Sequence, residues 1–236
     1  MKTKSISKIL VMRLSAFGDV AMTVPVITLL ARQFPQLRIT VLTRSRFQPL
    51  FEWAPANVEV KGINLDDYQG MTGLTRLYTQ LSAHDYDAVA DLHNVLRTRV
   101  MGLCFKLHGI AVARLDKQRS RRRALVNHES TDPVTPTVER YRWVFTRLGL
   151  EAPADFTRLY DGKEVPSSPM VPVKEPGQRW VAVSPFSAHD GKVYPLPLME
   201  RVVSLLSQRE NYCIFLMGGG KEEVFNKFKP VLEAMG

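Results

Sequence analysis

The sequence predicts an α/β fold built on parallel sheets, and three observations support it. Short runs rich in Val and Ile alternate with segments whose apolar residues recur at helical spacing. A proline-rich stretch interrupts this alternation, which then resumes. The composition, 45% hydrophobic and 23% charged, is typical of a globular chain. Strands that alternate with helices are joined by right-handed crossovers, so the sheets are expected to be parallel and covered on both faces.

The first part of the chain predicts a Rossmann-like domain over residues 1–160. Its strands are expected at 8–13, 39–43, 58–63, 86–92 and 110–115. Helices are expected at 20–34, 47–54, 72–82, 95–107 and 137–148. Gly149 stands just after the last of these helices, where a glycine commonly ends a helix.

Residues 161–178 are predicted to form an interdomain linker. Four prolines lie among Ser, Lys and Glu there, and proline fixes φ and removes a backbone donor, which disfavours helix and central strand. Beyond the linker, strands at 180–185 and 213–217 and helices at 196–208 and 222–235 predict a second Rossmann-like domain over 179–236. Two strands and two helices are few for an independent core, so this domain is expected to be partial.

Several features bear on the setting in which the chain works. The longest apolar run, residues 20–31, is shorter than the about 20 residues that a membrane-spanning helix needs. Residues 1–12 do not have the pattern of a signal peptide, so a cytoplasmic location is expected. The five histidines and two cysteines show no ligand spacing, and no bound metal is expected.

The net charge of +9 is concentrated between residues 97 and 123. Nine basic residues against one acid, Asp116, give this segment a charge of +8. Such a segment attracts an anionic partner, which on composition alone is nucleic acid, an acidic membrane surface or a phosphorylated glycolipid. Few aromatics accompany the basic residues and no nucleic-acid-binding motif is present, so nucleic acid is the least favoured of the three.

The first strand is predicted to end in a tight turn at Gly18-Asp19 and to lead into a helix. Ligands of open parallel sheets bind outside the carboxyl ends of the strands, so a carboxylate at this turn is expected to face a cleft. An aspartate at a helix start also caps the helix by accepting from a free backbone N–H. The residues alone leave both roles open for Asp19.

The spacing around Asp19 carries a resemblance to a known family. Residues 13–19 have the form Arg-x-Ser-x-x-Gly-Asp, followed six residues later by Pro25. This pattern resembles the N-terminal signature of the bacterial lipopolysaccharide heptosyltransferases, glycosyltransferase family nine. Asp91-Leu92 followed by Arg97 resembles that family's Asp-Leu-x-x-x-x-Arg stretch. The first domain thus matches the family pattern at two places in order.

Two later segments extend the resemblance. Residues 183–187, with Lys192 and Pro195, resemble the segment that opens the family's nucleotide-binding domain. Residues 215–219 resemble its next strand and glycine turn. Nothing in the sequence matches the family's later Asp-x-Gly-x-x-His type segment, so the second domain is expected to be truncated.

The resemblance implies a GT-B glycosyltransferase with two Rossmann-like domains. It implies transfer of a heptose from a nucleotide sugar, ADP-heptose, to a lipopolysaccharide core acceptor, with inversion, without metal and without a further cofactor. Such a reaction needs a base for the acceptor hydroxyl and cationic or dipolar groups at the departing diphosphate. By the family pattern the base is Asp19.

The remaining candidate residues divide into two groups. The donor is expected to contact Ser184, Ser187, Lys192, Gly218 and Gly219. The acceptor is expected to contact Ser15, Gly18, Arg97, Arg99, Arg119, Arg121, Arg122 and Arg123.

The resemblance also implies partners. The acceptor would be an anionic glycolipid, met by peripheral contact with the cytoplasmic face of the inner membrane, and the sequence leaves the oligomeric state open. The alternative function is a non-catalytic module that binds glycolipid or nucleic acid through residues 97–123.

Overall fold

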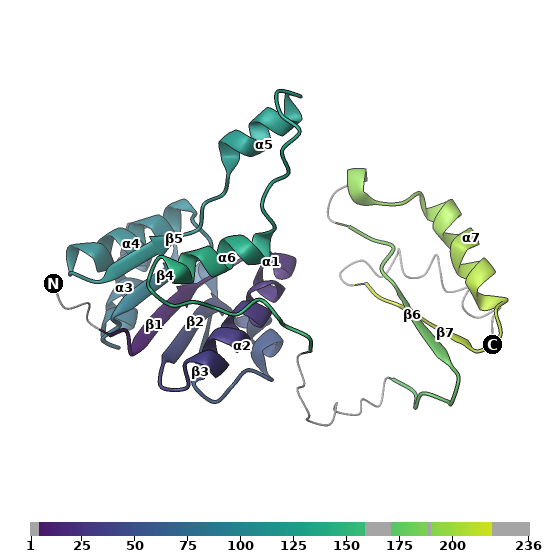
Figure 1. Ribbon diagram of the computed structural model, residues 1–236, viewed down its shortest axis with the longest axis horizontal. Coiled ribbons are helices and arrows are strands. Elements are labelled where there is room, and N and C mark those ends of the chain that lie inside the picture. The colour runs from purple at the N-terminus through teal and green to yellow at the C-terminus, as the bar shows by residue number, and fades with distance from the viewer. Residues whose placement is uncertain (1–4, 159–170, 188–189, 219–236) are drawn as a thin grey trace. The chain divides into compact units, whose positions relative to one another are not determined.

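The computed structural model describes residues 5–158, 171–187 and 190–218 (Figure 1). The chain divides into two compact units, Met1–Glu164 and Val165–Gly236. Every strand pair in both units is parallel. The predicted α/β class with parallel sheets is therefore confirmed.

Unit 1 is built on a five-stranded sheet in the order β3-β2-β1-β4-β5. The strands are β1 (Lys8–Met12), β2 (Arg38–Arg44), β3 (Val58–Ile63), β4 (Ala88–Asp91) and β5 (Ala111–Arg114). The apolar run of β1 forms the central strand, and its last four residues are fully buried. The strand order reverses between β1 and β4, and the crevice at such a reversal is the usual ligand position in open α/β sheets.

Helices cover both faces of this sheet (Figure 1). Helices α2 (Thr23–Gln33) and α6 (Thr137–Thr146) pack on the face that contains Ile9 and Val11. Helices α3 (Gly70–Ser82) and α4 (Leu96–Leu107) pack on the face that contains Leu10 and Met12. Successive side chains of β1 thus enter opposite cores, as the pleat of a strand requires.

The first strand-to-helix turn differs from the prediction. Helix α1 (Phe17–Ala21) begins before the expected turn, so Gly18 and Asp19 lie in its first turn. The prediction of a turn at Gly18-Asp19 is therefore wrong, because the chain turns between residues 13 and 16. The predicted helix over 20–34 is also two helices, since α1 ends before α2 begins.

Two further elements depart from the sequence pattern. The helix expected over 47–54 is a 3-10 segment, Ser45–Phe51, that contains Pro49. Another 3-10 segment, Leu65–Tyr68, follows β3. Helix α5 (Arg119–Val126) was not predicted, because its basic residues leave it without an apolar face to bury, and none of its residues is buried.

Helix α5 belongs to an arm that stands away from the sheet (Figure 1). The arm comprises residues 118–135 and is named here the basic arm. Its two ends are joined by hydrogen bonds: the Thr135 amide donates to Gln118 Oε1 at 3.0 Å, and Gln118 Nε2 donates to Thr135 Oγ1 at 3.0 Å. Arg140 of α6 donates from Nε to the Thr135 carbonyl at 3.0 Å and so fixes the base of the arm to the body of unit 1.

Unit 2 contains a two-stranded parallel sheet of β6 (Arg179–Val183) and β7 (Tyr212–Leu216). Helix α7 (Leu196–Ser207) and a 3-10 segment, Asp190–Lys192, lie between the two strands in sequence. Val183 and Val203 form its small core. The predicted helix over 222–235 and part of the predicted linker lie outside the described residues. Among the described helices, none is long and apolar enough to cross a membrane.

Candidate functional site

A cavity of about 300 Å³ lies at the carboxyl ends of β1 and β4, where the strand order reverses. It is lined by residues of the turn after β1, of α1, of the turn after β4, of the segment around α5 and of α6. These residues are Arg13, Ser15, Ala16, Asp19, His93, Leu115, Lys117, Arg122, Thr137, Arg140 and Tyr141. The site is therefore assembled from segments far apart in sequence.

Asp19 carries the carboxylate of this cavity. Its side chain is 39% exposed and forms an ion pair with Arg13. One carboxylate oxygen also accepts a long hydrogen bond, 3.4 Å, from the backbone amide of Ala16. Asp19 is the third residue of α1 and accepts from the backbone of the N-cap residue Ala16, as in a capping box, and its carboxylate also lines the cavity, so the structure shows both expected placements.

Arg13 holds the Asp19 carboxylate in place. Its side chain is nearly buried, and its Nη1 donates to the Leu92 carbonyl at 2.7 Å. The guanidinium also lies 5.8 Å from the centroid of the Tyr141 ring. Because the guanidinium contacts the end of β4 on one side and α6 on the other, the orientation of the carboxylate is set by the core of unit 1.

Tyr141 lines the cavity and anchors α1. It is fully buried and its hydroxyl donates to the backbone carbonyl of Asp19 at 3.2 Å. Burial, reinforced by the nearby Asp19 charge, raises the pKa of Tyr141 to about 12. The phenol therefore remains a neutral donor at physiological pH, and α6 fixes the position of the helix that carries the carboxylate.

His93 enters the cavity from the turn after β4. Asp91 shapes this turn, since its Oδ1 accepts from the amides of His93 at 3.0 Å and Asn94 at 2.7 Å. The Nε2 atom of His93 lies 3.2 Å from Ser15 Oγ. Burial first, and then the charges of Arg13 and Lys117, lower the pKa of His93 to about 4. The imidazole is therefore neutral at physiological pH.

The low pKa of His93 predicts a pH-dependent stability. As the pH falls through 6.5, the ordinary histidine pKa, the unfolded chain binds a proton that the folded chain accepts only near pH 4. We expect the wild type to lose about 1–2 kcal/mol more stability than His93→Gln across that range, since partial exposure weakens the effect. Urea unfolding of both proteins at neutral pH and in mild acid measures this difference in the free energy of unfolding. Equal losses in both proteins would contradict the buried neutral imidazole.

The cavity is strongly cationic. Four basic side chains line it against the single carboxylate of Asp19: Arg13, Lys117, Arg122 and Arg140. Burial, reinforced by the Arg119 and Arg13 charges, lowers the pKa of Lys117. Guanidinium groups bind two oxygens of a phosphate or carboxylate at once. The surroundings of Asp19 are thus suited to an anionic ligand.

Gly18 stands exposed next to Asp19 in α1. A Cβ placed there would meet no described atom within 4 Å, and its backbone is not in the left-handed region. Neither packing nor backbone conformation within the described residues therefore requires a glycine. A glycine at position 18 would still be required if a ligand approached the backbone closely there.

This explanation gives a prediction for Gly18→Ala. Because the helical backbone accepts alanine, we expect the variant to be unchanged or more stable by about 0.4–1 kcal/mol. Ligand turnover or affinity at the cavity should fall nonetheless, by about fivefold for a clash near 1 kcal/mol. A thermal melt and an activity assay on the same preparation give both values. Full activity would mean that Gly18 does not approach the ligand.

Of the predicted acceptor residues, Gly18 lies beside Asp19 in α1, and the other seven fall into three groups. Ser15 and Arg122 line the cavity with Asp19. The exposed residues Arg119, Arg121 and Arg123 lie with Arg122 on α5 of the basic arm.

Arg97 and Arg99 do not line the cavity. Arg97 Nη1 donates to the carbonyls of Leu65 and Tyr68, at 3.4 and 3.0 Å, and so supports the segment after β3. Arg99 Nε donates to Asn94 Oδ1 at 2.6 Å, beside the turn after β4. Both side chains thus have structural partners in unit 1.

The predicted donor residues lie in unit 2 at the carboxyl ends of its two parallel strands. Ser184 and Ser187 follow β6 and are exposed, and Gly218 follows β7. Lys192 ends the 3-10 segment and is also exposed, a few residues before the N-terminus of α7. Gly219 lies outside the described residues. The structure therefore places Ser184 and Gly218 just beyond the same edge of one small sheet.

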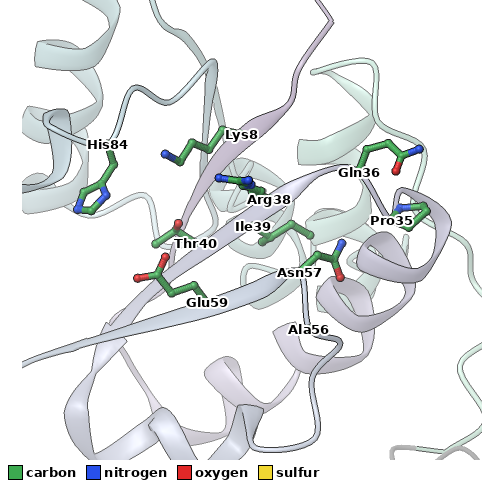
Figure 2. A pocket seen from close by; sticks show the side chains of 10 residues that line it. All are labelled: Lys8, Pro35, Gln36, Arg38, Ile39, Thr40, Ala56, Asn57, Glu59 and His84. Carbon is green, nitrogen blue, oxygen red and sulfur yellow. The ribbon is translucent and has the colours of Figure 1, made fainter.

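A larger cavity, about 610 Å³, lies at the opposite end of the sheet in unit 1 (Figure 2). Lys8, Arg38, Glu59 and His84 supply its charged and titratable side chains, from the amino ends of β1, β2 and β3 and the loop after α3. The amino ends of parallel strands are not where such sheets bind ligands. We therefore assign the candidate site to the smaller cavity at the carboxyl ends.

Comparisons with known proteins give matches in structure alone. No family model matches the chain, and no curated protein sequence does. The structure of Escherichia coli heptosyltransferase WaaC with ADP aligns over 97% of this chain and 72% of its own length, with a TM-score of 0.66 and 18% identity. The chain shares the fold of this heptosyltransferase.

Two other solved structures share the heptosyltransferase fold. The glycosyl transferase family 9 protein from Veillonella parvula aligns over 98% of this chain and 67% of its own, with a TM-score of 0.65 and 18% identity. E. coli ADP-heptose lipopolysaccharide heptosyltransferase II aligns over 97% and 69%, with a TM-score of 0.60 and 20% identity. The predicted GT-B fold class is thus supported over nearly the whole chain.

Some cavity residues of this heptosyltransferase fold were not predicted from the sequence as site residues. They are Arg13, His93, Leu115, Lys117, Thr137, Arg140 and Tyr141. The position directly after an apolar strand could have indicated Arg13 and His93, because both follow strands that end at the same edge. No sequence signal indicates Arg140 and Tyr141, since they lie in an ordinary amphipathic helix whose partner only the fold reveals.

Proposed function

We propose that the chain is an inverting glycosyltransferase of the heptosyltransferase type, acting on an anionic glycolipid of the lipopolysaccharide core. The observation that carries the proposal is the Asp19 carboxylate, oriented by Arg13 within a cationic cavity at the strand-order reversal. The likeness to WaaC, which has been solved with ADP and with ADP-2-deoxy-2-fluoro heptose, supports ADP-heptose as the donor.

In the proposed reaction Asp19 is the general base. The acceptor hydroxyl oxygen attacks the anomeric carbon on the face opposite ADP, and its proton passes to the Asp19 carboxylate as the new C–O bond forms. The bond between the anomeric carbon and the diphosphate oxygen breaks, and its electron pair leaves with ADP. Attack on the face opposite the leaving group inverts the anomeric centre.

The acceptor's phosphates and carboxylates would be held by the cations around Asp19. Arg122 and Arg140 present guanidinium groups to the cavity, and Lys117 adds a third charge. Arg119, Arg121 and Arg123 of the basic arm extend the positive surface beyond the cavity. We place the acceptor's anionic groups against this surface and its reacting hydroxyl at Asp19.

The donor's diphosphate would be held in unit 2. Lys192 supplies a positive charge, Ser184 and Ser187 supply hydroxyl donors, and the N-terminus of α7 supplies a helix dipole. Gly218, and Gly219 by the sequence pattern, would allow the chain to approach the nucleotide. In this proposal these groups stabilise the departing ADP without a metal ion, and the enzyme works peripherally at the cytoplasmic face of the inner membrane.

The proposal is tested by incubating the purified chain with ADP-heptose and a deacylated core acceptor. We expect release of ADP that depends on the acceptor, together with an acceptor product heavier by one heptose. The alternative function is a binding module without catalysis, in which the basic arm would bind the anionic ligand. Saturable acceptor binding with no ADP release above the rate of a donor-only control would favour that alternative.

A further inference from the structure

Helix α4 presents an exposed leucine face that packs against nothing described. Leu96, Leu103 and Leu107 are 80%, 52% and 77% exposed. Their spacing of seven and four residues puts them on one stripe of the helix, about 16 Å long at 1.5 Å per residue. The opposite side of α4 is already committed to the core through Met101 and Phe105. The helix α4 therefore has a second apolar face in addition to the one that packs into the core.

Basic residues flank this stripe, and acidic residues are missing from it. Arg99 and Lys106 lie along one side of the leucines at helical spacing, and both are exposed. The neighbouring helix α3 carries the 68% exposed Met71, whereas its Arg76 turns to the segment after β3 and donates to the Asp67 carbonyl. Neither α3 nor α4 contains Asp or Glu. An apolar stripe beside cations, with no anion on either helix, is complementary to an anionic lipid surface.

The stripe also begins beside the candidate site. Leu96 is the first residue of α4 and follows His93 by three positions, so it lies at the same edge of the sheet as the cavity. From there the stripe extends along α4 toward the amino ends of the strands. A lipid surface in contact with this stripe would thus lie close to the place where an acceptor's sugar must reach Asp19.

We propose that the α4 leucine face, defined as Leu96, Leu103 and Leu107 with Arg99 and Lys106, docks on an anionic membrane surface. The inference deepens the proposed function, on which it rests for the membrane-anchored acceptor. Three leucine side chains expose far less than the about 800 Å² that each partner buries in a stable protein complex. Two copies of this face would also bring like charges together, so self-association is disfavoured.

The test is flotation of the full chain with phosphatidylcholine vesicles, with and without about 30 mol% phosphatidylglycerol. We expect binding to the anionic vesicles that weakens with salt. The variant Leu96→Ser/Leu103→Ser/Leu107→Ser should bind them at least tenfold more weakly, because the inserted side chains are gone. Trp143→Ser, a change at an exposed aromatic on the opposite face of the sheet, is the matched control and should bind as the wild type does.

Further arms separate this proposal from its alternatives. Lys106→Glu keeps the leucines and should lower binding to anionic vesicles by several-fold, which gives a readout if the triple variant does not fold. Wild-type binding by the folded triple variant would overturn the proposal. A failure of the wild type to bind vesicles would also overturn it. If the wild type instead formed a dimer that the triple substitution disrupts, the face would be a protein interface.

Activity distinguishes this proposal from the proposed function. The triple variant should transfer sugar to a deacylated acceptor at the wild-type rate, and at least tenfold more slowly to an acceptor embedded in anionic vesicles. Transfer without vesicle binding would overturn the docking surface alone. Vesicle binding without transfer to either acceptor would overturn the glycosyltransferase and leave the membrane surface standing.

Discussion

Asp19→Asn is expected to lower kcat for sugar transfer by about 10³-fold, within the range that a general base contributes. The amide keeps the shape of the side chain and can still accept from Arg13, so the protein should fold normally. What it lacks is the basicity needed to take the acceptor proton. Acceptor affinity should be unchanged or higher, because the cavity loses its only carboxylate. Initial rates together with acceptor titration by calorimetry measure the two effects separately.

Two controls make the Asp19 result specific. Asp155→Asn removes an exposed carboxylate outside the cavity and should leave kcat unchanged. Asp19→Ala should match Asp19→Asn in activity but show a lower Tm, since the contact with Arg13 is lost. If Asp19→Asn kept more than about a tenth of the wild-type kcat, the base would have to be another group.

Removal of three charges from the basic arm is expected to raise the acceptor KM by about 10²-fold with little change in kcat. In Arg121→Ala/Arg122→Ala/Arg123→Ala each lost guanidinium removes a charge-assisted contact worth about 1 kcal/mol at an exposed site. Alanine favours helix, and no residue of α5 is buried, so the arm should keep its structure. The wild-type KM should rise with salt, and the variant should respond much less. Rates at two ionic strengths measure both.

The matched control for the arm removes the same charge elsewhere. Arg32→Ala/Arg38→Ala/Arg158→Ala changes three exposed arginines that lie outside the cavity. If this control raised KM as much as the arm variant did, overall charge rather than the basic arm would attract the acceptor. A loss of kcat in the arm variant, with KM unchanged, would instead place the arginines at the reacting atoms.

The sheet of unit 1 could be predicted closely because its strands are buried on both faces. Such strands are continuous apolar runs, and the expected strand over 8–13 differs from the central strand β1 (Lys8–Met12) by one residue. The turn after β1 could not be predicted, because nothing local to the sequence shows that the helix begins at Phe17. Helix α5 was not predicted, because a helix with no buried face shows no helical periodicity of apolar residues in its sequence.

The candidate site could be predicted only where a polar residue directly follows a recognisable apolar strand. Asp19 and Ser15 were found from the residues after the first strand, and they do line the cavity. Arg97 was expected near the acceptor from its charge and from the Asp-Leu-x-x-x-x-Arg pattern. Neither shows where a side chain points, and its guanidinium donates to the carbonyls of Leu65 and Tyr68. Long-range partners such as Tyr141, which lies 122 residues from Asp19, depend on the fold.

The contact between Arg13 and the Leu92 carbonyl has a mechanistic consequence. Because it links the Asp19 carboxylate to the ends of the adjacent strands β1 and β4, the carboxylate oxygens are held as rigidly as the sheet itself. If Asp19 is the general base, the free-energy cost of orienting its carboxylate is therefore met when the chain folds rather than when substrate binds.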